Sequence, residues 1–475
     1  MKRLTIATEA YLQKGLVVAT LATLSFLLLA ARPLWLFSGV TFTVIGFGAF
    51  LFVLLFAVSA AHRSQALDPA KTYFRLALVV WWSLLISEEA FFRHTREVES
   101  VAGHFSAEAY GEAAFWALAF LALLLIMTRP QYLRQAFSGS NKWLSLFVAV
   151  CLVSAPFSPT PMYSLAWAFK LSLVVLLVLL CSATIHDLSD IKSFYWSNLW
   201  GFFAVAVAPV VRAFVNPSGP FEKGRLWGSP TGLSASAGTL VLLALILNSL
   251  QKRAWLAGFA SVGAAVMIMA GGKAGIAAGI ASVTLFFVLQ KRVAAGFGWL
   301  LGVLILGGIL LAVTPLSTYF ATYEEEGHLS TISGRTELWT AAWPEIVQHP
   351  IVGHGYLASR FLSEHVEGTF PEAGHMHNGF LEALYNNGLL GLTILAAIHL
   401  VIVKNLWRAL KGAPNRDAHL LAIGSWAIYV NLLINGLFNA TFGGAARALF
   451  MLLLGLLVIS EALRRNARLP VRLPK

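Results

Sequence analysis

The chain has 475 residues, of which 58% are hydrophobic and 12% are charged, and its mean hydropathy is +0.74. Soluble domains carry about 25% charged residues, so this composition excludes an ordinary soluble protein and predicts a polytopic membrane protein. A net charge of +12 would suggest nucleic-acid binding in a soluble chain, but here the basic residues lie in short segments beside apolar runs. Such residues orient membrane helices and attract anionic lipid, so membrane lipid is an expected partner and nucleic acid is not.

Apolar runs long enough to cross a membrane recur along most of the chain. Because a helix needs about 20 apolar residues to cross the hydrocarbon core, the runs predict an all-α fold with about 12–14 transmembrane helices. In chain order the candidate spans are 15–31, 36–61, 74–92, 112–128, 143–157, 164–184, 195–214, 231–250, 254–270, 274–289, 296–315, 379–403, 419–439 and 446–463. Lys2-Arg3 before the first run resembles a signal peptide, but the further spans favour an uncleaved first helix.

The Lys and Arg residues predict the orientation. With the N-terminus in the cytoplasm, 23 of the 34 Lys and Arg residues fall on the cytoplasmic side, 10 on the opposite side and Lys170 inside a span. The positive-inside rule supports this orientation, which also places the C-terminus in the cytoplasm. The ten residues on the outer side are Arg32, Arg93, Arg96, Arg212, Lys223, Arg225, Lys273, Arg335, Arg360 and Arg447.

The predicted organisation has three regions. Residues 1–315 hold eleven membrane helices, 316–378 form one large external loop with short helices and the candidate catalytic residues, and 379–475 hold three membrane helices and a basic cytoplasmic tail. The loop is too small to bury a core alone, so we expect it to pack against the membrane helices.

One segment of the loop has helical periodicity. Ser333-Gly334-Arg335-Thr336 predicts a turn, and the apolar residues after it recur at helical spacing. We expect an amphipathic helix that lies across the membrane surface as a lid and is bent by Pro344. The residues on its apolar side are Leu338, Trp339, Ala342 and Ile346.

Three basic residues on the predicted outer side are candidate ligands for a phosphate or pyrophosphate. Arg225 lies at the mouth of a span, Lys273 lies between two apolar runs, and Arg335 lies in the large loop. Arginine grips phosphate oxygens with two parallel hydrogen bonds, whereas lysine acts as a point charge. The ordinary alternative is that each side chain reaches lipid headgroups or pairs with a loop carboxylate such as Glu222 or Glu337.

His377 is the candidate general base, because it stands at the entrance to a span on the predicted outer surface. A neutral imidazole accepts a proton from a hydroxyl group near neutral pH. The alternative is a histidine that bonds a loop carbonyl at a helix end. His375 and His377 also permit metal ligation, but two histidines at this spacing do not share a helix face and no Cys or paired carboxylates accompany them, so we predict no metal.

Four neighbouring residues are expected to support this site. Asn378 is a candidate cap for the helix that follows, and Trp339 is either a sugar-stacking residue or a member of an interfacial tryptophan belt. Gly388 and Gly391 lie three apart on that helix, which predicts close packing by a neighbouring helix.

The combination of these motifs resembles the bacterial O-antigen ligase and polysaccharide polymerase superfamily. The resemblance rests on the order of parts across about residues 220–440, above all on the spacing of the last element. Its parts are Gly334-Arg335-Thr336-Glu337-Leu338-Trp339, His349-Pro350 with Gly353-His354-Gly355, and His377-Asn378 spaced nine residues from Gly388-x-x-Gly391.

This resemblance implies a membrane-embedded, inverting glycosyltransferase of the GT-C type that uses no cofactor, metal or nucleotide sugar. Its donor would be a glycan on undecaprenyl pyrophosphate, with external arginines on the pyrophosphate and a loop histidine activating the acceptor hydroxyl. Arg335 and His377 match directly. Arg225 matches less closely, because Gly228-Ser229-Pro230-Thr231 replaces the family's Asn-Pro-Asn-like element, and Lys273 stands where the family has Ser-Arg.

The acceptor distinguishes the remaining functions. Gly334-Arg335-Thr336 and His377-Asn378-Gly379 favour a polymerase that extends surface or exopolysaccharide repeat units. The alternatives are a ligase that transfers to lipid A-core, a protein O-oligosaccharyltransferase, and, more remotely, a transporter or lipid flippase, for which Lys170 is the mid-span residue to consider. The implied location is the bacterial inner membrane, and a chain-length regulator protein is a further candidate partner.

Overall fold

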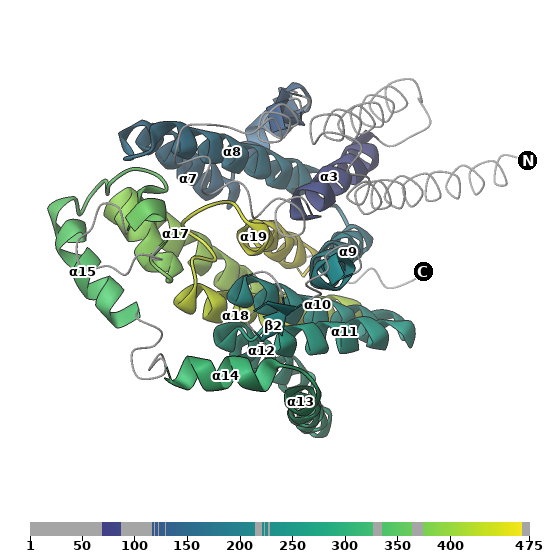
Figure 1. Ribbon diagram of the computed structural model, residues 1–475. Helices are drawn as coiled ribbons and strands as arrows, with labels where there is room; N and C mark the ends of the chain where they lie inside the picture. The colour runs from purple at the N-terminus through teal and green to yellow at the C-terminus, as the bar shows by residue number, and fades with distance from the viewer. Residues whose placement is uncertain are drawn as a thin grey trace, which may run out of the picture.

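The computed structural model describes residues 69–86, 116–117, 119–121, 123–128, 130–213, 221–222, 224–226, 229–325, 335–362 and 374–467. Within these residues the fold is an all-α membrane protein (Figure 1). The predicted spans 15–31 and 36–61 lie outside the described residues, and the span 112–128 is described only in part.

The described residues of the other eleven predicted spans coincide with helices, and the span 74–92 is described only to residue 86. These helices are α3 (Pro69–Ile86), α7 (Asn141–Ser154), α8 (Pro161–Thr184), α9 (Leu188–Ala213), α10 (Pro230–Gln251), α11 (Trp255–Met269), α12 (Lys273–Leu289), α13 (Val293–Val313), α17 (Gly379–Lys411), α18 (Arg416–Phe438) and α19 (Ala448–Asn466). In the described part of the chain, α8, α10, α13, α17 and α18 are long and apolar enough to cross a membrane.

The remaining described elements are short. Between α3 and α8 lie α6 (Pro130–Ala136) and the 3-10 turn η2 (Ala155–Phe157), and before α10 a small antiparallel hairpin pairs β1 (Phe221–Glu222) with β2 (Arg225–Leu226). The large loop contains α14 (Leu316–Glu325), α15 (Arg335–Gln348) and the 3-10 turn η3 (Ala358–Phe361).

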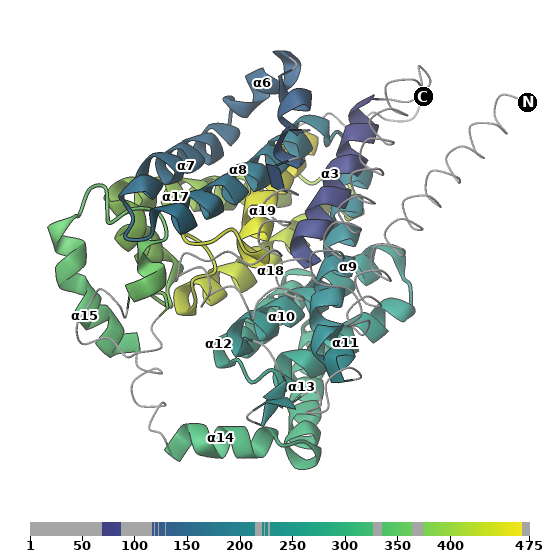
Figure 2. The same cartoon turned by 45° about the horizontal axis from the view of Figure 1, so that its top comes forward.

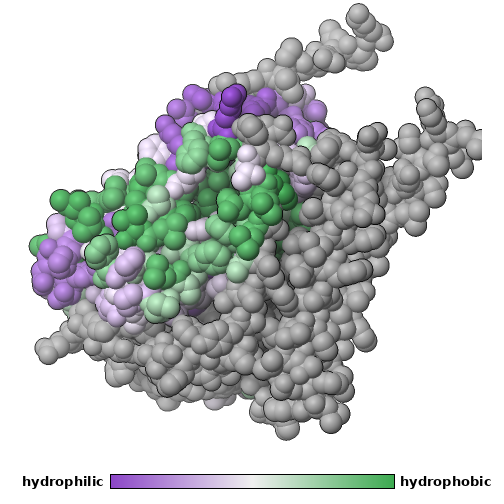
Figure 3. Space-filling view, turned by 90° about the horizontal axis from the view of Figure 1, so that it is seen from above, coloured by the Kyte–Doolittle hydropathy of each residue, from purple (hydrophilic) through white to green (hydrophobic). Residues whose placement is uncertain are grey.

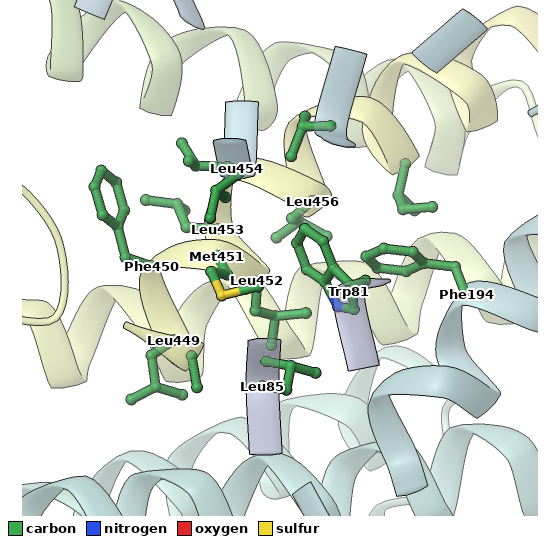
Figure 4. Close-up of a cluster of buried hydrophobic side chains, with 14 of the residues drawn as sticks. Trp81, Leu85, Phe194, Leu449, Phe450, Met451, Leu452, Leu453, Leu454 and Leu456 are labelled. Atoms are coloured by element: carbon green, nitrogen blue, oxygen red, sulfur yellow. The ribbon is translucent and has the colours of Figure 1, made fainter. Parts of the chain in front are cut away.

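Helix α19 lies in the middle of the bundle and is buried along most of its length. Trp81 of α3 and Phe194 of α9 converge on it (Figure 4), with ring centroids 5.2 Å apart. They meet at Gly455, where a Cβ atom would lie 2.6 Å from the Phe194 ring. The missing side chain of Gly455 therefore lets two large rings pack closely against one helix. Close packing of this kind stabilises helix association in lipid, where no hydrophobic effect drives helices together.

Residues predicted to share one side of the membrane gather at the same end of the bundle. At the predicted cytoplasmic end, Lys192 Nζ lies 2.6 Å from Asp417 Oδ2, and Arg416 donates to the Ser249 carbonyl at 3.2 Å. At the other end, Gly272 at the start of α12 packs against Pro230 at the start of α10. The alternation of the predicted spans therefore agrees with the packing.

The surface over α7 and α8 shows the pattern of a lipid-facing belt. Seen from this side, a broad band of hydrophobic residues lies between two hydrophilic areas (Figure 3). Val153, Phe157 and Met162 on these elements are all exposed. Exposed apolar residues in such number mark a membrane interface rather than a water-facing surface.

Helix α17 is not the continuous span that the sequence predicted. It breaks at Gly388, where the backbone has φ 61° and ψ −161°, so that 379–387 and 389–411 form two separate helical segments. A Cβ atom at Gly388 would lie 2.3 Å from the carbonyl of Ile351, and one at Gly391 would lie 2.3 Å from Cβ of Asn387. The predicted role of Gly388 and Gly391 in packing a neighbouring helix is therefore wrong, because Gly388 admits a loop backbone and Gly391 faces its own preceding turn.

The backbone groups freed at this break bond to residues 350–355. In a continuous helix the N–H groups of 389 and 390 would bond the carbonyls of 385 and 386. Here Leu389 and Leu390 donate instead to the carbonyls of Pro350 (2.8 Å) and Ile351 (3.2 Å). The carbonyls of 385 and 386 in turn accept from the N–H groups of 354 (2.9 Å) and 355 (2.9 Å). The motif His349-Pro350-x-x-Gly353-His354-Gly355 thus supplies hydrogen-bond partners to the backbone groups that the break leaves without helical partners. Non-helical backbone at membrane depth requires such partners.

Candidate functional site

The loop helix α15 is attached to the beginning of α17 through its apolar side. Leu338, Ala342 and Ile346 are buried in a cluster with Met376 and Tyr385. The predicted amphipathic face is therefore confirmed, and the helix continues through Pro344. Figures 1 and 2 both show α15 at the outer edge of the molecule, beside α17.

Trp339 fixes this helix to the segment that carries the histidines. Its indole N–H donates to the carbonyl of Met376 at 2.8 Å, and the side chain is half-buried. Arg335 is the first residue of α15, one helical turn before Trp339, and is also half-buried. The hydrogen bond from Trp339 therefore brings Arg335 to the neighbourhood of His377.

The four residues 375–378 are held from several sides. The N–H of Met376 donates to Glu382 Oε2 at 2.9 Å, and the N–H of His377 donates to His375 Nδ1 at 3.1 Å. Asn378 caps α17, as predicted, because its Oδ1 accepts from the N–H groups of Phe380 (2.9 Å) and Leu381 (3.1 Å). These contacts hold His377 at φ 51°, a left-handed conformation that is uncommon for a residue other than glycine.

The surroundings of His377 favour the neutral imidazole. Burial and the positive charges of Arg335 and Arg360 lower the pKa of His377 from 6.5 to about 4. Its Nδ1 is buried and has no hydrogen-bond partner among the described residues. The side chain therefore offers an uncharged ring nitrogen close to two guanidinium groups.

Arg225 and Lys273 form a second basic group at the same end of the bundle. The guanidinium of Arg225 lies over the ring of Tyr319 in α14, 5.8 Å from its centroid, and donates to the carbonyl of Leu226 at 3.3 Å. The backbone at Gly271 passes against the same Tyr319 ring. Lys273 begins α12 two residues later, and its side chain is exposed.

Three charged residues at this site were not singled out from the sequence. Glu382 is fully buried, and its Oε1 accepts from Ser359 Oγ at 2.6 Å while its Oε2 binds the Met376 N–H. Arg360 and Arg447 lie close enough for their charges to act on this carboxylate. The sequence held a signal for each, because both arginines depart from the positive-inside rule and Glu382 is an acidic residue within a predicted span.

His354 has a structural environment rather than a catalytic one. Its Nε2 lies 3.1 Å from the carbonyl of Glu345, and its ring stacks on Tyr385 with centroids 4.5 Å apart. Burial is the main cause that lowers the pKa of His354. Across the described residues, no three His, Cys, Asp or Glu side chains converge as metal ligands would.

Lys170, the mid-span residue of the transport alternative, is fully buried between two aromatic rings. Its Nζ lies 4.8 Å from the ring centroid of Trp116 and 4.6 Å from that of Trp167. Such cation–π contacts stabilise an ammonium group away from water. Lys170 therefore lies in a packed aromatic environment.

Comparison with known proteins gives one family. Residues 259–396 match the family model described as O-antigen ligase. The matched segment runs from α11 into α17 and includes Lys273, Arg335, His377 and the break at Gly388, whereas Arg225 precedes it. Among curated proteins, none matches the sequence significantly. The resemblance of the sequence to the O-antigen ligase and polysaccharide polymerase superfamily is thus confirmed over residues 259–396.

Proposed function

We propose that the protein transfers a glycan from undecaprenyl pyrophosphate to an acceptor hydroxyl at the outer face of the bacterial inner membrane. The acceptor oxygen attacks the anomeric carbon while His377 takes the hydroxyl proton. A new glycosidic bond forms, the bond between the anomeric carbon and the pyrophosphate oxygen breaks, and the pyrophosphate leaves with the electron pair. Because attack and departure occur on opposite faces, the configuration inverts.

The environment of His377 is the observation that carries this proposal. A general base must be deprotonated before the reaction, and burial beside two guanidinium groups keeps the imidazole neutral. The strained backbone at φ 51° is held in place by the contacts of Met376, Trp339 and Asn378. A histidine fixed in this way is preorganised for proton transfer.

The arginines account for the other half of the reaction. The departing pyrophosphate develops negative charge, which fixed positive groups in a site of low dielectric stabilise strongly. Arg335 lies close enough to His377 for its charge to act on the imidazole, so the base and the leaving group would lie within one site. Arg225 and Lys273 would hold the donor from the neighbouring group around Tyr319.

Incubation of the purified protein with a lipid-linked oligosaccharide tests the reaction and its acceptor together. We expect a ladder of longer lipid-linked glycans, because the motifs around Arg335 and His377 favour a polymerase. Transfer to added lipid A-core without a ladder would make the protein a ligase, and transfer to Ser or Thr of a protein acceptor would make it an oligosaccharyltransferase. Absence of any transfer, with intact donor and folded protein, would overturn the proposed function.

A further inference from the structure

A small cavity lies between the start of α10 and the segment that joins α18 to α19. Its volume is about 70 Å³, and the described residues that line it include Ser229, Arg360, His375, Glu382, Asn439 and Arg447. None of these six was assigned a role from the sequence. The cavity adjoins the candidate base, because the rings of His375 and His377 lie with centroids 4.0 Å apart.

Positive charge dominates among the described residues of this cavity. Of those that line it, Arg360 and Arg447 carry guanidinium groups and Glu382 carries a carboxyl group. Both Glu382 oxygens accept hydrogen bonds, from Ser359 Oγ and the Met376 N–H. The lining also includes the first turn of α10, a 22-residue helix capped by Ser229. The N-terminus of such a helix carries partial positive charge and favours an anion.

A buried side-chain oxygen without a hydrogen-bond partner among the described residues is a second, independent indication of a ligand. Asn439 is 9% exposed, and its Oδ1 is buried with no hydrogen-bond partner among the described residues. Leaving a buried polar atom without a partner costs free energy, so such an atom in a cavity calls for an explanation. Since the amide oxygen and nitrogen can exchange places by rotation of the side chain, Asn439 can present N–H donors to an anion.

The size of the cavity selects the kind of anion. One water molecule needs about 10–15 Å³ of such space, so the cavity has room for roughly five heavy atoms. A phosphate group has this size. Each guanidinium group can also donate two parallel hydrogen bonds to two oxygens of one phosphate group, which a single-atom anion does not offer.

We propose that this cavity is a binding subsite for one phosphate group of the lipid-linked diphosphate, with Arg360 and Arg447 as its principal ligands and Asn439 as a third donor. The identity of the ligand rests on the proposed function, and the chemistry of the subsite rests on the cavity itself. One oxygen of Glu382 accepts a hydrogen bond from Ser359, the residue before Arg360. The other oxygen accepts from the N–H of Met376, in the segment that carries the histidines. Phosphate binding and the position of the base are thus coupled through one carboxylate.

Binding of farnesyl diphosphate to the purified full-length protein in detergent tests this subsite. We expect Arg360→Gln and Arg447→Gln each to weaken binding by about tenfold or more, because each removes a charge-assisted hydrogen bond. Arg416→Gln is the matched control, since Arg416 is an exposed arginine at the opposite end of the bundle. Wild-type affinity in both cavity variants would overturn the proposal.

Asn439→Asp keeps the test decisive if an arginine variant does not fold. This change preserves the size of the side chain and places a negative charge in the cavity, so we expect farnesyl diphosphate binding to be lost while gel-filtration behaviour and apparent melting temperature stay normal. Unchanged binding in folded Asn439→Asp would contradict the subsite. If the proposed function fails, the wild type shows no glycan transfer; if only the subsite fails, the wild type transfers glycan and the cavity variants bind the diphosphate normally.

A second arm separates the two natural sources of phosphate in a membrane. Inorganic pyrophosphate and short-chain phosphatidylglycerol are each added as competitors of farnesyl diphosphate. We expect pyrophosphate to compete and phosphatidylglycerol not to compete. Competition by phosphatidylglycerol alone, lost in Arg447→Gln, would make the cavity a lipid headgroup site and overturn its assignment to the diphosphate.

Discussion

At the scale of single residues, the charges around His377 set the pH range in which it can act. Its neutral form is the active one, so activity should fall as the pH falls through its pKa, which is about 4 rather than the usual 6.5. We therefore expect the acid limb of kcat/KM, which reports the free enzyme, to lie near pH 4. The profile of kcat should have its acid limb at higher pH, because a bound pyrophosphate offsets the positive charges of Arg335 and Arg360.

Arg360→Gln tests whether the charge of Arg360 lowers the pKa of His377. Removing one positive group raises the pKa of His377, so the acid limb of kcat/KM should move to higher pH than in the wild type. His349→Gln is the control, since His349 is exposed in the turn after α15. An acid limb at the same pH in Arg360→Gln and the wild type would show that the charge of Arg360 does not act on His377.

The lowered pKa of His377 also affects folding stability. Between about pH 6.5 and pH 4 the unfolded chain binds more protons at this histidine than the folded chain does, so its contribution to stability falls as the pH falls through this range.

Glu382 is expected to act as a positioning residue. Glu382→Gln keeps an oxygen for the Met376 N–H and an amide for the Ser359 hydroxyl, so the histidine segment should stay in place. Glu382→Ala removes both contacts, and we expect it to lower kcat far more than Glu382→Gln, with little change in KM. Equal kcat values in the two variants, both folded, would show that these hydrogen bonds do not position the base.

At the scale of elements, the apolar runs predicted where helices form, because a lipid environment requires every backbone group to bond within its own helix. All eleven predicted spans within the described ranges, the span 112–128 aside, are helical, and the face of α15 and the cap at Asn378 were also predictable from local patterns. Helix α9 begins at Leu188, seven residues before the predicted span. Hydropathy does not detect this first part, which is polar and is capped by Asp187 and Asp190 through backbone N–H groups.

The break in α17 was not predictable from hydropathy. Gly388 lies in an apolar run, and its role depends on residues 350–355, which pair with it from more than 30 positions earlier in the chain. The meeting of Arg360, Glu382 and Arg447 has the same cause, since each comes from a different element. Local periodicity carries no information about such distant pairing.

Gly388→Ala tests the break. An alanine there would need φ 61° and ψ −161°, a backbone region that essentially only glycine occupies and that costs other residues about 1–3 kcal/mol, and its Cβ atom would also overlap the carbonyl of Ile351. We expect the apparent melting temperature in detergent to fall by several degrees. Gly302→Ala in α13 is the control, because a Cβ atom at Gly302 meets nothing within 4 Å. Equal melting temperatures of Gly388→Ala and the wild type would contradict the broken-helix account.

At the scale of the whole molecule, the two ends of the bundle differ in the groups they gather. One end pairs Lys192 with Asp417 and Arg416 with the Ser249 carbonyl, while the other holds the loop helices, His377 and the outer arginines. We proposed that the end with His377 faces outward. The exposed residue Gln348 at the end of α15 is a suitable position to test this orientation.

Cysteine labelling in spheroplasts checks this orientation. Gln348→Cys should react with a membrane-impermeant maleimide, whereas His419→Cys, exposed at the opposite end, should react only after lysis. The native cysteines Cys151 and Cys181 are buried, so background labelling should be low. The reverse pattern would overturn the proposed orientation.

The central claim is that His377 removes the proton of the acceptor hydroxyl during glycan transfer. The most direct measurement is the rate of product formation from a lipid-linked oligosaccharide by purified His377→Ala, compared with the wild type and with His349→Ala. General bases contribute about 10²–10⁴-fold, so His377→Ala should be slower by that factor, with farnesyl diphosphate binding and melting temperature nearly unchanged, and His349→Ala should match the wild type. A His377→Ala protein that retained most of the wild-type rate would contradict the account.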